Sequence, residues 1–406
     1  MPKSLDDLDV RILEGLAEHG PRNIAELAKK LHIPRGTVIS RIDRMSSSFY
    51  LRLLTTIYHS NLGMKKAVVF AKATLGYEDL LFNCLKANKF YIYLSRCYGM
   101  FEGCICIYVI PVEHTNEFED FLEEVQKLGV TQKIDLRWST CLHTINLTSN
   151  WFDGDTKTWI FQWKNWVEEI FSANNELPYT LKDPPNFPLK ADETDLFILK
   201  ELEKDATVSL ASIAKKFGTS LQNVRYHFEK HVITNGLVET YQIAILPYGT
   251  ANSDLLWFIF KFGDTEKMAK FAKSLLDKPF VPKLGKILGD SSLVAQICLP
   301  RQELRNFIDT LSNLARAKFL LDYEYVFQDL RQGRWSRETI PYEFFKNGSW
   351  VYEHSKHLEA LHKLVSGSEP PSQSNACERY ESTSIGLGFS EVGKRENEKD
   401  QSASEQ

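Results

Sequence analysis

The stretch Leu5-Asp-Asp-Leu-Asp-Val-Arg-Ile-Leu-Glu-Gly-Leu16 returns in altered form 186 residues later, and this repeat decides the fold. At that offset Asp9 aligns with Asp195, and the alignment continues without a gap through the following helical segments. The tripeptide Arg-Trp-Ser at 137–139 returns at 334–336, at a different offset. Internal self-similarity of this kind indicates a duplicated structural unit, here about 175 residues long, whose middle differs in length between the copies.

Each copy begins with three short amphipathic segments. The apolar residues that recur at helical spacing are Leu5, Leu8, Ile12, Leu13 and Leu16, then Ile24, Leu27, Ala28 and Leu31, then Val38 and Ile42 in the first copy. The second copy repeats the pattern with Leu196, Leu199 and Leu202, then Leu210, Ile213, Ala214 and Phe217, then Val224 and Phe228. Three short helices joined by tight turns form a helix-turn-helix. Asn235-Gly236 then predicts a turn into a wing strand over 238–246.

The pattern after each helical trio becomes strand-like. In the first copy we expect strands near 65–72, 90–98, 103–110 and 132–138, with helices near 77–87 and 115–128. In the second copy we expect strands near 255–262, 283–288, 293–299 and 323–327, with helices near 265–276 and 301–317. Both copies therefore end in a ferredoxin-like β-α-β-β-α-β domain. The predicted class is α+β, with two tandem units that each join a winged helix-turn-helix to such a domain.

The domain boundaries follow from this order. We predict winged helices at 1–58 and 191–246, and ferredoxin-like domains at 59–173 and 247–365. Each of these domains ends in an aromatic extension, which contains Trp151, Trp163 and Trp166 in the first copy, and which we expect to pack on its own domain. The Pro-rich segment 174–190 is predicted to be an exposed linker, and 366–406 a disordered tail.

Composition restricts the class of protein without naming a function. The chain of 406 residues is 43% hydrophobic, has a net charge of -4 and contains no apolar run long enough for a membrane helix. No signal segment is evident, so we expect a cytoplasmic protein. The seven cysteines have no metal-type spacing and are expected to be reduced core residues. No catalytic or nucleotide-binding motif is present, so neither an enzyme nor a cofactor is predicted.

The helical motifs resemble those of the Lrp/AsnC family of transcription regulators. The matching residues are Leu5-x-x-Leu8-Asp9-x-x-Ile12-Leu13-x-x-Leu16, Glu26-Leu27-Ala28-x-x-Leu31 and Thr37-Val38-x-x-Arg41-Ile42-x-Arg44-Met45. The resemblance implies a winged helix that binds double-stranded DNA and a sensor domain that pairs through its sheet and binds a small effector. Tandem duplication departs from the usual single copy, and it predicts that one chain forms an intramolecular pseudo-dimer, with further self-association left open. Pro34 also replaces the polar residue that usually caps the third helix.

Candidate DNA contacts lie on the third helix of each trio, where arginine can bond guanine, and asparagine or glutamine can bond adenine. They are Arg35, Thr37, Ser40, Arg41 and Arg44 in the first copy, and Gln222, Asn223, Arg225, Tyr226 and His227 in the second. The resemblance places the effector at the loops after the second sensor strand. The corresponding residues are Gly99, Glu102, Gly289, Asp290 and Ser292, and they depart from the family's amino-acid-binding pattern.

Other interpretations of the sequence remain open. The winged helices could serve a protein-binding scaffold that has lost DNA affinity. Siroheme decarboxylases resemble the same two-part unit, so an enzyme of that type is a further alternative. His227 and His231 are spaced to share a metal, but no third ligand is evident in the sequence and no metal is predicted. His354, His357 and His362 are expected on a solvated helix face.

Overall fold

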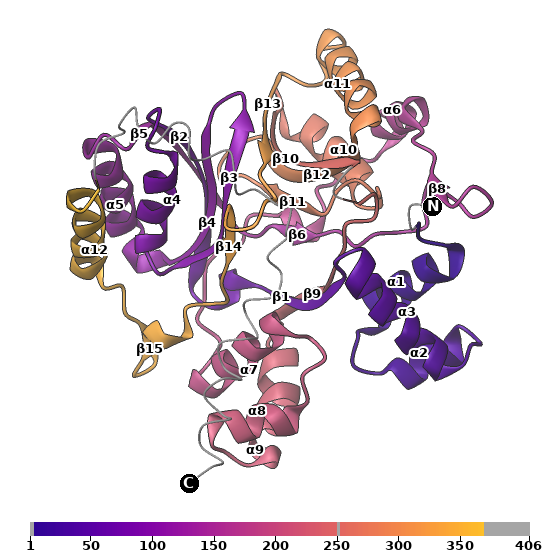
Figure 1. The fold of residues 1–406 in the computed structure, drawn as a ribbon, viewed down its shortest axis with the longest axis horizontal. Coiled ribbons are helices and arrows are strands. Elements are labelled where there is room, and N and C mark those ends of the chain that lie inside the picture. The colour runs from indigo at the N-terminus through magenta and orange to yellow at the C-terminus, as the bar shows by residue number, and fades with distance from the viewer. Residues whose placement is uncertain (1–3, 250–251, 369–406) are drawn as a thin grey trace.

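The computed structural model describes residues 4–249 and 252–368, and these form the two predicted α+β units (Figure 1). The elements of the first unit are α1 (Asp7–His19), α2 (Ile24–Lys30), α3 (Arg35–Ser48), β1 (Arg52–Ile57), η1 (His59–Asn61), β2 (Met64–Ala73), α4 (Glu78–Ala87), β3 (Tyr91–Gly99), β4 (Gly103–Pro111), η2 (Val112–His114), α5 (Thr115–Lys127), β5 (Thr131–Ser139), β6 (His143–Thr144), β7 (Phe152–Asp153), β8 (Thr158–Trp159) and α6 (Trp163–Ser172).

A 3-10 turn, η3 (Tyr179–Leu181), lies between the units. The elements of the second unit are α7 (Glu193–Lys204), α8 (Leu210–Phe217), α9 (Leu221–Tyr226), the π-helix η4 (His227–Ile233), β9 (Val238–Ala244), β10 (Ser253–Lys261), α10 (Thr265–Leu275), β11 (Lys283–Lys286), β12 (Ser292–Pro300), α11 (Arg301–Arg316), β13 (Asp322–Gln328), β14 (Trp335–Arg337), η5 (Tyr342–Phe344), β15 (Phe345–Lys346), β16 (Ser349–Trp350) and α12 (His354–Ser366). The predicted order of elements is confirmed in both units.

The duplicated aspartates begin the first helix of each unit in the same way. The Asp6 carboxylate accepts a hydrogen bond from the Asp9 backbone N at 2.9 Å, and the Asp9 carboxylate accepts one from the Asp6 backbone N at 2.8 Å. Asp192 and Asp195 form the same reciprocal pair at 3.0 Å at the start of α7. Each pair is a capping box, which satisfies backbone donors that a helix start leaves without partners. This explains why the acidic pair occurs in both copies.

The two ferredoxin-like sheets join edge to edge and also face each other. Strands follow the order β5-β2-β4-β3-β13-β10-β12-β11-β6, so that β3 of one unit pairs with β13 of the other. Side chains alternate between the two faces of a strand. In β2, Val69 packs under the helices of its own unit, whereas Val68 packs with Trp257 and Ile259 of the second unit. The expected packing of one sensor domain on the other is therefore present.

The strands that follow the two helical trios pair with each other. β1 and β9 form an antiparallel ribbon from Arg52 opposite Ala244 to Ile57 opposite Val238. Ile243 of β9 lies in the core of the first helical trio, and the Leu53 carbonyl of β1 accepts a hydrogen bond from Ala206 of the second unit at 2.9 Å. The ribbon runs beneath the joined sheets and connects to both trios (Figure 1). Each wing strand thus supports the helices of the other unit.

The aromatic extensions cross between the units, and the prediction that each packs on its own domain is wrong. Trp166 of α6 is fully buried against Phe271 and Phe307 of the second unit. In return, Tyr352 packs on Phe90 of the first unit, and α12 covers α4 and α5 (Figure 1). Each extension therefore covers the helices of the other unit's sensor domain.

Three further expectations are corrected or completed by the structure. The Pro-rich linker is attached rather than free, because Lys190 N donates to the Asn61 carbonyl at 2.9 Å and Leu181 is buried. His357 is buried between the units rather than solvated, and burial lowers its pKa to about 4. The six cysteines of the described residues are free and buried, as predicted.

Cys377 and nearly all of the predicted tail lie outside the described residues. Among the described helices, none is long and apolar enough to span a membrane.

Candidate nucleic-acid interface and central cavity

The third helix of the first unit exposes part of its predicted contact set. α3 begins after Pro34, whose φ of -60° and ψ of 139° are compatible with a helix start, although no side chain caps it. Arg35 and Ser40 are exposed, and Thr37 is half-buried. Val38 and Met45 are fully buried against α1 and α2, so they fix which face of α3 meets solvent. The exposed face carries Arg35 and Ser40.

Two of the predicted DNA-binding arginines are held by acidic groups of α1. Arg41 Nη1 lies 2.6 Å from Asp6 Oδ1 and 2.9 Å from Asp9 Oδ1, and Arg44 also pairs with Asp9. Burial acts to raise the pKa of Asp6, but the hydrogen bonds from Arg41 and Asp9 and the Arg41 charge together outweigh it, and the pKa is lowered. The hydrogen bond to Asp6 raises the pKa of Arg41. These two arginines therefore anchor α3 to α1.

The corresponding helix of the second unit has a different surface. Gln222, Arg225 and Tyr226 are exposed, whereas Asn223 is half-buried and donates to Thr219 Oγ1 at 3.3 Å. Ser220 caps α9 by accepting from the Asn223 backbone N at 3.1 Å. The two helices thus offer different side chains at equivalent positions.

His227 is turned away from solvent and meets the acidic pair of α7. Its Nδ1 lies 2.9 Å from Asp195 Oδ1, and His231 Nδ1 lies 3.3 Å from Asp195 Oδ2. Two carboxylates therefore lie beside the two histidines, although no third potential ligand was evident in the sequence. Asp192 and Asp195 are more than thirty residues earlier in the chain, and only the packing of α9 and η4 on α7 brings the four residues together.

The predicted effector loops lie on different parts of the joined sheet. Gly99 ends β3 opposite Val326, and the neighbouring Met100 lines a cavity of about 230 Å³ between the units. Asp290 accepts a hydrogen bond from Ser292 Oγ at 2.9 Å within its own hairpin. That hairpin contacts β5, because Leu288 N donates to the Trp138 carbonyl at 2.8 Å. The structure does not join Glu102 with the second loop into one site.

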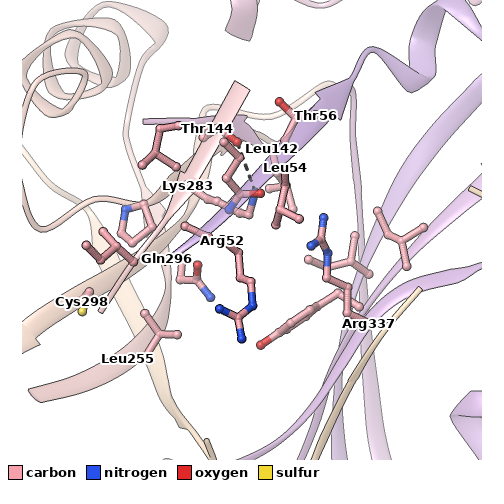
Figure 2. Close-up of a pocket in the computed structure, with 18 of the residues that line it drawn as sticks. Arg52, Leu54, Thr56, Leu142, Thr144, Leu255, Lys283, Gln296, Cys298 and Arg337 are labelled. Atoms are coloured by element: carbon pink, nitrogen blue, oxygen red, sulfur yellow. Dashed lines mark hydrogen bonds between the residues drawn. The ribbon is translucent and has the colours of Figure 1, made fainter. Parts of the chain in front are cut away.

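A larger cavity, of about 710 Å³, lies between the β1–β9 ribbon and the joined sheets. Arg52 of β1, Lys283 of β11 and Arg337 of β14 reach into this space from three elements (Figure 2). Its apolar walls include Leu142 and Trp257. Seven of the lining residues are lysine or arginine and two are glutamate. Lys204 and Lys278 are paired with acidic groups outside the cavity, so the excess of positive charge comes mainly from the others.

Three of these cations lack a direct ion pair. Within residues 4–249 and 252–368, Lys66, Lys283 and Arg337 form no salt bridge, although the Glu203 charge acts on Arg337 and the Glu239 charge acts on Lys283. Burial and the neighbouring Lys66 and Arg337 charges lower the pKa of Lys283 to about 7. Burial also lowers the pKa of Arg337. Buried cations without a direct ion pair are costly, and an anion in the cavity would relieve that cost.

Two further buried groups line the same cavity. Burial raises the pKa of Glu203 to about 7, and its carboxylate accepts a hydrogen bond from Ile340 N at 2.8 Å. His59 is almost fully buried, and neither of its ring nitrogens has a hydrogen-bond partner in the described structure. Burial holds the pKa of His59 well below its usual range. A buried polar ring without partners requires an explanation, and a water molecule or a ligand in the cavity would supply one.

Sequence reasoning did not find this cavity, because its lining comes from strands that are distant in the chain. The one available signal was the repeated Arg-Trp-Ser tripeptide. Its second copy leads into β14, where Trp335 and Ser336 pair with β3 and line the cavity beside Arg337.

The comparisons with known proteins support the winged helices directly. Residues 5–46 match the AsnC-type helix-turn-helix domain, and residues 192–230 match a winged helix-turn-helix DNA-binding domain. The chain is 53% identical over 45 residues to an uncharacterized HTH-type transcriptional regulator of Pyrococcus horikoshii, and 40% identical over 57 residues to the HTH-type transcriptional regulator Rv2324 of Mycobacterium tuberculosis. These matches span only 30% and 38% of the two regulators.

The whole fold is also similar to a solved structure, that of the siroheme decarboxylase NirDL. The TM-score is 0.52 at 12% identity, and the match covers 88% of this chain and 98% of that one. The prediction that the chain is not an enzyme, which rests on the absence of catalytic motifs, is therefore wrong, because a protein of similar tandem fold is an enzyme. Residues 5–46 form an AsnC-type helix-turn-helix domain, and a second winged helix follows in tandem, as the resemblance to the Lrp/AsnC family predicts.

Proposed function

We propose that the chain is a sequence-specific DNA-binding transcription regulator that carries two unequal DNA-binding helices. Two helix-turn-helix domains support this proposal, and the β1–β9 ribbon connects them. Each domain has exposed polar side chains on its third helix. Arg35 is the principal candidate for a base or phosphate contact, because it is exposed at the start of α3. Arg41 and Arg44 would act mainly by holding α3 in place.

The second helix would contact a different sequence. Leu221 and Tyr226 stand where the first unit has Arg35 and Ser40, and both are exposed. A pseudo-dimer with unequal helices prefers two different half-sites, whereas a symmetric dimer prefers a palindrome. Selection of bound duplexes from a random pool tests this at fixed salt. We expect an asymmetric consensus, and a perfect palindrome would contradict the unequal roles.

The small-molecule effector is proposed to bind in the 710 Å³ cavity rather than at the predicted loops. Cavities of this size bind small molecules in many proteins, and this one touches both the β1–β9 ribbon and the sensor sheets. Because Lys283 and Arg337 face the cavity, the expected ligand is an organic anion with an apolar body. A panel of such anions should raise the melting temperature of the parent chain. The same shift in Lys283→Gln would contradict this location.

A siroheme-decarboxylase-like activity is the second candidate. It is favoured by the likeness to NirDL over most of the chain, together with a basic cavity suited to a substrate that bears carboxylates. Incubation of the chain with siroheme, followed by mass spectrometry of the tetrapyrrole, tests it. Loss of carboxyl groups that depends on Arg337 would support the enzyme. An unchanged tetrapyrrole, together with selective DNA binding, would support the regulator alone.

A further inference from the structure

Four potential metal ligands converge in the second winged helix. They are Asp192 and Asp195 at the start of α7 and His227 and His231 in η4, and their ligand atoms all lie within 4.8 Å of one another. From His227 Nδ1 the distance is 2.9 Å to Asp195 Oδ1 and 3.6 Å to Asp192 Oδ2. From His231 Nδ1 the distance is 3.3 Å to Asp195 Oδ2 and 3.9 Å to Asp192 Oδ2.

The capping box leaves two carboxylate oxygens available to this cluster. Asp195 Oδ2 accepts from the Asp192 backbone N, and Asp192 Oδ1 accepts from the Asp195 backbone N, each at 3.0 Å. The other two oxygens, Asp195 Oδ1 and Asp192 Oδ2, are the ones nearest to His227. The helix cap and a metal can therefore use different oxygens of the same two residues.

The first unit has an arginine in place of the first histidine of this cluster. Asp6 and Asp9 occur at the same place there, and Arg41 stands where the second unit has His227. Arg41 compensates the buried carboxylate with a permanent charge and cannot bind a metal. Histidine and aspartate together form sites for Zn²⁺. The second unit thus keeps the carboxylates and replaces an arginine by an imidazole.

We infer that Asp192, Asp195, His227 and His231 bind one Zn²⁺ ion in tetrahedral coordination. Ligands about 2.0–2.2 Å from zinc in a tetrahedron lie about 3.3–3.6 Å apart. The separations from the histidine Nδ1 atoms to the two oxygens that the helix cap does not use are 2.9, 3.6 and 3.9 Å, which bracket this value. The side chain of Asp195 is 1% exposed and that of Asp192 is 52% exposed, so the cluster is anchored inside and open to solvent on one side. Zinc would tie the start of α7 to the end of the third helix.

Cobalt substitution of the full chain tests the site. Metal-free protein is titrated with Co²⁺, whose visible absorption is intense in tetrahedral sites and weak in octahedral ones. We expect one Co²⁺ per chain with a tetrahedral spectrum, no sulfur-to-metal charge-transfer band, and displacement by Zn²⁺. A charge-transfer band would instead assign the metal to cysteine and overturn the inference, as would an octahedral spectrum or no uptake.

Two variants make the result specific. His227→Arg introduces the arginine that the first unit has at this position, so Asp195 keeps a positive partner and the variant should fold normally. Its affinity for Co²⁺ should be at least tenfold lower. His231→Asn should lose uptake as well. His362→Asn is the control, because His362 is an exposed histidine of α12 that pairs with Glu124. Equal uptake by His227→Arg and the parent would contradict the site.

Discussion

The Asp9 carboxylate, which is completely buried, lies 2.9 Å from Arg41 Nη1, so α1 holds α3 in place through an ion pair. Arginines of α3 that the sequence motif predicts as DNA contacts can therefore stabilise the fold instead. Experiment can separate the two roles. Substitution of a structural arginine lowers the free energy of unfolding, whereas substitution of a contact arginine weakens DNA binding.

Asp9→Asn is expected to destabilise the chain by about 1–3 kcal/mol, because it removes the charge that compensates Arg41 and Arg44. The side chains of these two arginines are 27% and 35% exposed, so water compensates part of the loss. Urea unfolding measures the change, and Asp43→Asn, an exposed position of α3, is the control. A double-mutant cycle with Arg41→Ala should show coupling, and additive effects would contradict the ion pair.

Trp166→Ala is expected to destabilise the second unit although Trp166 belongs to the first. Trp166 is fully buried, and its Nε1 donates to Ser274 Oγ at 3.1 Å, so the loss should be about 3–5 kcal/mol. Hydrogen exchange should become faster in α10 and remain unchanged in α4. Tyr179→Ala is the control, because Tyr179 is 84% exposed. Faster exchange in α4 alone would contradict the crossing of the extensions.

Local patterns predicted most of the fold. The period-2 strands and capped helices of both units depend on neighbours in sequence, and the repeat supplied the order twice. The crossing of the extensions could not be predicted, because Trp166 shows the same apolar spacing whichever unit it covers. The cavity was missed for a related reason: Lys66, Lys283 and Arg337 are separated by long stretches of chain, and only the pairing of β1 with β9 encloses them.

Glu203 gives the chain a specific pH dependence of stability. Burial raises its pKa to about 7 in the folded chain, above the ordinary value of 4.5. The protonated carboxyl therefore contributes to the free energy of unfolding. This contribution is fully present below pH 4.5 and is lost as the pH rises through 7, and the total loss is about 3 kcal/mol. The contribution of Lys283 to stability changes with pH in the opposite sense, because burial lowers its pKa to about 7.

Glu203→Gln should remove this loss, because the amide stays neutral and its oxygen still accepts from Ile340 N. Thermal unfolding of both proteins between pH 5 and pH 8 measures the difference. We expect the variant to gain stability over the parent as the pH rises. Parallel curves over this range would contradict a protonated Glu203.

The apolar inner faces of the two sheets cover each other within one chain, so dimerisation is not needed to bury them. Light scattering is expected to give the mass of one chain, 46.8 kDa, at micromolar concentration. An obligate dimer would contradict the view that duplication replaces the pairing of two subunits.

DNA binding through the first unit is the central claim, and Arg35→Ala tests it most directly. Fluorescence anisotropy with the selected duplex gives the affinity of parent and variant at matched salt, with Arg305→Ala on α11 as the control. We expect about tenfold weaker binding or more for Arg35→Ala, with unchanged unfolding, because a good arginine contact contributes about 1–3 kcal/mol. Equal affinity of Arg35→Ala and the parent, or no selective binding by the parent at low salt, would contradict this claim.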